Sequence, residues 1–154
     1  MIYLAIVFNE SQRIFYLHTK STSYIFGFLN NNLVHIYWGE KLLEIPDVKV
    51  CVPYCKRPQS AYNDPENIDI QPDNLPLEFP LYGNTDLRGP MFHAMYEDGS
   101  TISDFKYVSH KILSGKSKLS GLPATYGDEN EVQTLEIEFF DEKTNVKAIL
   151  SYSV

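Results

Sequence analysis

Short hydrophobic runs separated by polar stretches open the chain. They fall at residues 14–18, 24–29 and 33–38, and are rich in aromatic and β-branched residues. These residue types favour β-strands. Residues 30–32 are three asparagines, and because asparagine tolerates left-handed backbone, they predict a hairpin turn between the second and third runs. Residues 48–52 form a further candidate strand.

The clearest alternation of hydrophobic and polar positions lies near the end of the chain. Residues 135–139 alternate in this way, and residues 146–154 repeat the pattern after a polar stretch. A period of two gives a strand one buried and one wetter face, as in antiparallel sheets. Residues 101–112 are also predicted to be a strand. A hairpin at Asp98-Gly99 would lead into it, since Asp-Gly between apolar runs favours a tight turn.

Residues 56–90 follow neither pattern and hold six of the nine prolines. Proline removes a backbone donor and fixes φ, so this segment is predicted to be neither a central strand nor a long helix. No helical periodicity extends beyond about two turns elsewhere. We therefore predict an all-β fold, an antiparallel β-sandwich spanning residues 1–154 with a long Pro-rich loop.

Composition narrows the possible partners. The net charge of −7 argues against nucleic acid, which requires clustered Lys and Arg, whereas a neutral ligand such as a sugar is compatible. The apolar start, residues 1–8, has no basic residue before it and is too short for a signal peptide, and no segment could span a bilayer. We predict a cytoplasmic protein with no membrane partner.

The two cysteines, Cys51 and Cys55, have a spacing that matches neither a redox pair nor a zinc knuckle. No set of His, Asp and Glu has metal-ligand spacing either. We therefore expect two ordinary thiols, no metal and no cofactor.

Four stretches of the chain carry its most distinctive residue combinations. They are residues 21–40 (STSYIFGFLNNNLVHIYWGE), 78–90 (EFPLYGNTDLRGP), 98–109 (DGSTISDFKYVS) and 115–126 (GKSKLSGLPATY). Together and in this order they resemble the N-terminal domain of family 36 glycoside hydrolases, the α-galactosidases or melibiases. One departure is Leu87, which stands where an aromatic residue is common in that family.

The resemblance implies a β-supersandwich of the galactose mutarotase type, followed in the same polypeptide by a catalytic (β/α)₈ barrel. It implies retaining hydrolysis of α-galactosides such as melibiose and raffinose by two barrel aspartates. Those aspartates have no counterpart here, so we assign no catalytic residue and expect this chain alone to be inactive. The strand running up to Val154 indicates a truncated domain. The resemblance also implies a homo-oligomer, with galactoside near a subunit boundary.

Tyr82, Asp86 and Arg88 match the family signature within the Pro-rich segment. Aspartate accepts hydrogen bonds from sugar hydroxyls and a planar arginine donates two in parallel, so this loop is a candidate substrate entrance or interface. The structural alternative is an Asp–Arg pair that pins an irregular loop, with Tyr82 packed beneath it. Gly83 is expected to adopt a positive φ.

Trp38, the only tryptophan, is the fourth candidate. It could stack on a sugar, but a half-buried aromatic residue on a strand is the interpretation we favour. For the whole chain, we favour a non-catalytic α-galactosidase domain that contributes to assembly and shapes the active-site entrance. The alternative is a stand-alone carbohydrate-binding or protein-interaction module, and because sandwiches host many functions, both stay open.

Overall fold

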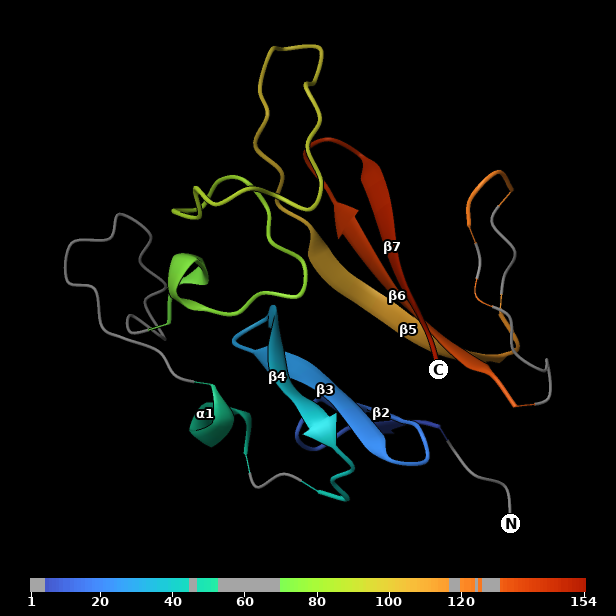
Figure 1. Cartoon of the computed structure of the whole chain (residues 1–154). Helices are drawn as coiled ribbons and strands as arrows, with labels where there is room; N and C mark the ends of the chain where they lie inside the picture. Colours follow the sequence, from blue (N-terminus) through green and yellow to red (C-terminus); the bar gives the residue numbers. More distant parts are fainter. Residues whose placement is uncertain (1–4, 45–46, 53–69, 117–119, 124, 126–130) are drawn as a thin grey trace.

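A computed structural model describes residues 5–44, 47–52, 70–116, 120–123, 125 and 131–154. It contains two antiparallel sheets (Figure 1). The first has the order β1-β2-β3-β4, with the strands Ile6–Asn9, Ile14–His18, Thr22–Leu29 and Asn32–Glu40. The second has the order β5-β6-β7, with the strands Lys106–Ser114, Gln133–Asp141 and Val146–Ser153.

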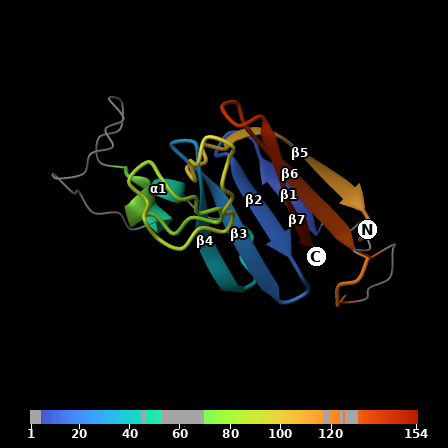
Figure 2. The same ribbon diagram turned by 90° about the horizontal axis from the view of Figure 1, so that it is seen from above.

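The two sheets stack as layers, and the strand axes of one sheet are roughly aligned with those of the other (Figure 2). Phe15 and Phe26 from the first sheet share one hydrophobic cluster with Leu135, Ile137 and Phe139 from the second. This aligned stacking over a common core is the architecture of a β-sandwich. The predicted all-β sandwich is confirmed.

Strand β2 is buried on both faces. Phe15 and Leu17 point into the cluster between the sheets, whereas Ile14 and Tyr16 join a second cluster on the opposite face. The second cluster also holds residues from outside the sheet, among them Val52, Ile70 and Leu75. Two-sided burial explains why β2 reads as a nearly continuous hydrophobic run.

Strands β6 and β7 show the predicted alternation. Leu135 and Ile137 are fully buried, and their neighbours Glu136 and Glu138 point outward. The outward carboxylates pair with lysines from the flanking strands, in the ion pairs Lys111–Glu136 and Lys147–Glu138. The outer face of this sheet is therefore a solvated, charge-paired surface.

The asparagine turn between β3 and β4 is confirmed. Leu29 lies opposite Asn32, so the turn consists of Asn30 and Asn31, whose φ values are 49° and 64°. Two consecutive left-handed residues give the turn a twist that matches the flanking strands.

Three predictions about secondary structure need correction. Residues 48–51 form one helical turn, α1 (Val48–Cys51), rather than a strand, because the carbonyl of Asp47 accepts the N–H groups of Val50 and Cys51. The strand predicted over residues 101–112 begins only at Lys106. The turn at residues 97–99 does form, with hydrogen bonds between Tyr96 and both Gly99 and Ser100, but no ladder extends from it.

The Pro-rich segment is irregular where it is described. Residues 70–90 contain a single 3₁₀ turn, η1 (Pro72–Asn74), and isolated bridges such as Val34 to Leu77. This agrees with the prediction that proline excludes a central strand or long helix. In Figure 1 the segment runs beside both sheets.

No helix within the described ranges is long and apolar enough to cross a membrane.

The left-handed turn gives a direct test of the fold. We expect Asn31→Ala to lower the free energy of unfolding by about 1 kcal/mol, because alanine is strained at positive φ. Asn31→Gly should stay within about 0.5 kcal/mol of the parent chain. Urea unfolding of the three proteins measures both values, and equal stability of the two variants would contradict the assignment.

Candidate functional site

The loop that carries the candidate residues is closed by a tight turn. Gly83 and Asp86 exchange backbone hydrogen bonds of 3.0 and 2.9 Å, and Asn84 and Thr85 between them have φ values of 49° and 72°. Gly83 itself has φ +122°, and a Cβ there would lie 2.6 Å from a methyl carbon of Ile102. The predicted positive φ of Gly83 is confirmed. This backbone conformation places Gly83 opposite Asp86 in the turn.

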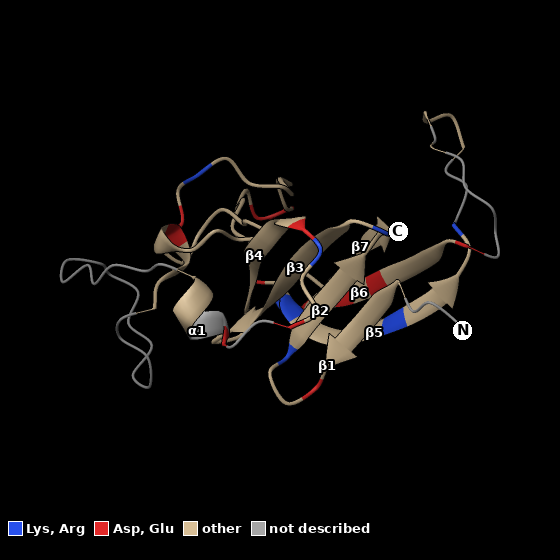
Figure 3. Ribbon diagram, turned by 60° about the horizontal axis from the view of Figure 1, so that its bottom comes forward, with Lys and Arg blue, Asp and Glu red and all other residues tan. Residues whose placement is uncertain are grey.

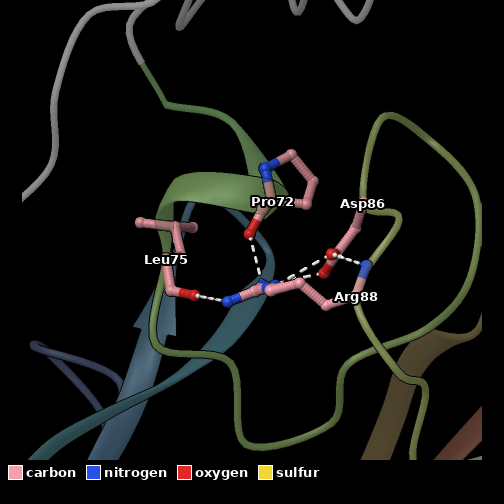
Figure 4. Close-up of polar contacts among 4 residues, drawn as sticks. All are labelled: Pro72, Leu75, Asp86 and Arg88. Atoms are coloured by element: carbon pink, nitrogen blue, oxygen red, sulfur yellow. Dashed lines mark hydrogen bonds and ion pairs between the residues drawn. The ribbon is translucent and has the colours of Figure 1, made fainter.

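Arg88, whose side chain is 44% exposed, holds the loop through four side-chain hydrogen bonds (Figure 4). Its Nε and one terminal nitrogen donate to the two carboxylate oxygens of Asp86, at 2.9 and 2.7 Å. The terminal nitrogens also donate to the carbonyl oxygens of Leu75 and Pro72, at 2.8 Å each. One guanidinium thus ties the 83–88 loop to the η1 turn.

Asp86 is 1% exposed, so its charge depends on this arginine. Burial alone would raise the pKa of the Asp86 carboxyl, but the hydrogen bonds from the Arg88 side chain and backbone, together with its positive charge, lower it overall. The Asp86 hydrogen bonds and charge likewise raise the pKa of Arg88. The pair stays ionised and pins the loop, as the structural alternative predicts.

Tyr82 and Trp38 are the exposed aromatic members of the candidate set. Tyr82 is 38% exposed, and its packing beneath the Asp–Arg pair stays a prediction. Trp38 lies on β4 and is 75% exposed, so the favoured prediction of a half-buried aromatic residue is wrong. It borders a groove of about 310 Å³ lined by side chains of both sheets, including Leu17, Tyr24, Tyr152 and Val154.

Glu78, which the sequence does not single out as a site residue, joins the two sheets. Its side chain is 7% exposed and accepts hydrogen bonds from Tyr24 at 2.6 Å and Tyr152 at 3.0 Å. The Nδ1 atom of His35 lies 3.1 Å from the same carboxylate. Burial, with added contributions from Glu78, raises the pKa of both tyrosine hydroxyls. In the sequence, the signal for this buried carboxylate is a single acidic residue between two hydrophobic ones, Leu77 and Phe79.

Three buried carboxylates stabilise the fold. Besides Asp86 and Glu78, Asp141 is buried and accepts the backbone N–H groups of Asp104, Lys143 and Thr144. Within the described ranges, no group of three or more His, Cys, Asp or Glu side chains could hold a metal ion. Cys51 is a free thiol, whereas Cys55 lies outside the described residues. Lysines, arginines and acids are interspersed over the ribbon rather than gathered by sign (Figure 3).

Loss of the Arg88 guanidinium should destabilise the fold. We expect Arg88→Ala to cost about 2–3 kcal/mol, because it removes the charged partner of a buried carboxylate and one of the two donors to each of the Pro72 and Leu75 carbonyls. Arg88→Lys should recover only part of this, since one ammonium lacks the planar fork. Lys147→Ala, which removes an exposed ion pair, is the matched control and should cost less than about 1 kcal/mol. Urea unfolding measures both losses in the free energy of unfolding. A loss for Arg88→Ala no larger than that for Lys147→Ala would contradict this role.

The tyrosines bound to Glu78 predict a loss of stability at high pH. Their pKa values are raised in the folded chain, so the unfolded chain deprotonates first as the pH rises through the ordinary value of about 10. The stabilisation is complete below that pH, and the free energy of unfolding should fall above it. Urea unfolding between roughly pH 9 and pH 11 tests this. The fall should be shallower in Tyr152→Phe, and an identical pH dependence in both proteins would refute the assignment.

Comparisons with known proteins agree with this architecture. A family described as "Glycosyl hydrolase family 36 N-terminal domain" matches residues 31–154. Alpha-galactosidase AgaA of Geobacillus stearothermophilus is 35% identical over 152 residues, which make up 97% of this chain and 21% of that protein.

Two solved structures from the same organism extend the likeness to the fold. GH36 alpha-galactosidase AgaB superposes with a TM-score of 0.86 at 35% identity, over 98% of this chain and 20% of its own. An AgaA variant in complex with raffinose gives a TM-score of 0.83 at 36% identity, over 92% of this chain and 20% of its own. The chain thus spans about a fifth of the length of these relatives. It belongs to glycosyl hydrolase family 36, whose N-terminal domain it represents.

Proposed function

We propose that this chain is the non-catalytic N-terminal domain of a retaining α-galactosidase that hydrolyses terminal α-galactosides of the melibiose and raffinose type. The observation that carries the proposal is the match along nearly the whole chain to a fifth of AgaA, an α-galactosidase. A relative with a closely similar fold is solved with raffinose bound, which supports this substrate class.

The chemistry of the domain supports a non-catalytic role. A glycosidase requires two carboxyl groups that reach the substrate. In this chain Asp86, Asp141 and Glu78 are committed to an arginine, to backbone N–H groups and to tyrosines. The reacting carboxylates would then come from a barrel in the same polypeptide, which is the first partner of this domain.

The exposed aromatic residues suggest how the domain contributes. Trp38 and Tyr82 offer surfaces to a neighbouring domain, to a second subunit of a homo-oligomer or to galactoside at a subunit boundary. Asp86 and Arg88 act indirectly, as positioning residues that hold the loop bearing Tyr82. The free thiol of Cys51 is consistent with a cytoplasmic enzyme.

A chimera tests the proposed function directly. This chain replaces the matched N-terminal fifth of AgaA, and hydrolysis of p-nitrophenyl-α-galactoside is measured beside AgaA lacking that segment and beside this chain alone. We expect activity and an AgaA-like molar mass, by light scattering, only where the chain and the remainder of AgaA are joined. Activity in the chain alone, or a chimera no better than the truncated enzyme, would overturn the proposal.

Substitutions in the chimera separate entrance and assembly from chemistry. We expect Trp38→Ala and Tyr82→Ala to raise KM about three- to tenfold or to weaken assembly, with kcat nearly unchanged, because neither side chain takes part in the reaction. Lys147→Ala, on the outer face of β7, is the control and should change neither. A fall confined to kcat in an intact oligomer would refute the assigned roles.

A further inference from the structure

Residues 91–96 are anchored by the side chains on their inner face. They belong to the yellow loop that projects at the top of Figure 1. The Phe92 ring packs edge-on against Phe105, with 5.4 Å between the ring centroids, and the Tyr96 hydroxyl lies 2.8 Å from that of Ser103. These contacts fix which side of the segment faces the rest of the protein.

The outer face of the same segment carries two thioethers and an imidazole. Burial alternates from residue to residue, as it does along an extended chain, so Met91, His93 and Met95 lie on one side. All three are exposed, Met91 by 62% and Met95 by 78%. Methionine is more often buried in protein interiors, so packing does not account for two exposed methionines beside a histidine.

His93 differs from the other three histidines. One ring nitrogen of each of those lies 2.8 to 3.1 Å from a hydroxyl or carboxylate oxygen (His18, His35 and His110). Among the residues that the structure describes, none makes a hydrogen bond, an ion pair or a ring contact with His93. Its two ring nitrogens are therefore available to a ligand.

Two thioethers around an imidazole favour a soft cation. Sulfur ligands of this kind select Cu(I), and imidazole suits copper, whereas Ca²⁺ and Mg²⁺ require oxygen ligands. Residues two apart in an extended chain are separated by about 6–7 Å. A methionine and a histidine on one face can close that span through metal bonds of about 2.3 Å to sulfur and about 2.0 Å to nitrogen. The net charge of −7 also favours a cation over an anion.

We propose that Met91, His93 and Met95 bind a Cu(I) ion, with the imidazole as the central ligand and a thioether on each side. The inference goes beyond the proposed function, because it assigns to this chain a ligand that is neither a galactoside nor a partner protein. It also differs from the expectation of no metal, which rested on the spacing of His, Cys, Asp and Glu and left thioethers out.

The test is a titration with Ag(I), an air-stable ion that has the charge and the ligand preference of Cu(I). Nuclear magnetic resonance of the methionine methyl groups and histidine rings follows the binding. The chain carries Cys51→Ser and Cys55→Ser, because thiolates would otherwise take up the soft ion. We expect saturable shifts at Met91, His93 and Met95, with a Kd on the order of 10 μM.

Three substitutions within the segment remove one ligand each. Met91→Leu and Met95→Leu keep the side-chain volume and remove the sulfur, and His93→Gln removes the imidazole. Each should weaken Ag(I) binding about tenfold. Leu87→Met is the matched control, since it adds a thioether at a position that is 74% exposed and has no histidine two residues away.

Leu87→Met should bind Ag(I) like the parent chain. Absence of saturable shifts at the three ligands, equal binding by the parent and all three ligand variants, or a second ion bound as tightly at position 87 would overturn the proposal. The titration measures binding by this chain alone, and the chimera measures catalysis and assembly. Failure of the metal proposal therefore leaves the proposed function standing, and the reverse also holds.

Discussion

One nearly buried carboxylate connects the parts of this molecule. Glu78 comes from the irregular segment, yet it accepts hydrogen bonds from Tyr24 on β3 and Tyr152 on β7, and it contacts His35 on β4. Its partners lie 43 to 74 residues away in the sequence. A buried carboxylate is stable only when its oxygens accept hydrogen bonds. The donors to Glu78 come from both sheets, so burial of Glu78 requires the two sheets and the connecting segment to assemble together.

Arg88 provides the complementary constraint from the cationic side. Proline removes some backbone donors from this segment, and side-chain donors add to those that remain. The planar guanidinium gives a second donor to the carbonyls of Pro72 and Leu75, which also accept the N–H groups of Leu75 and Leu77, and it neutralises Asp86. The irregular connection is therefore held by two ionic side chains, Glu78 toward the sheets and Arg88 toward its own turns.

The strands were predictable because their side chains carry the signal locally. Alternation at 135–139 and the asparagines at 30 and 31 determine a buried face and a left-handed turn without reference to the remaining chain. The single turn of α1 was predicted to be a strand, since a short segment with two β-branched valines, Val-Lys-Val-Cys, suits either structure. The burial of Trp38 and of Glu78 depends on which distant segments cover these side chains. Periodicity along the chain does not contain that information.

Because β2 is buried on both faces, its backbone should resist local opening more than the strands at the edges of the sandwich. Amides of a strand covered on both faces become accessible to solvent only when both hydrophobic clusters separate. The outermost strands β5 and β7 are covered on one face and each has one paired neighbour, so their amides can exchange through smaller local movements. Hydrogen exchange would then proceed from the rim of the sandwich inward, with β2 and β3, the two inner strands whose side chains reach both clusters, protected longest.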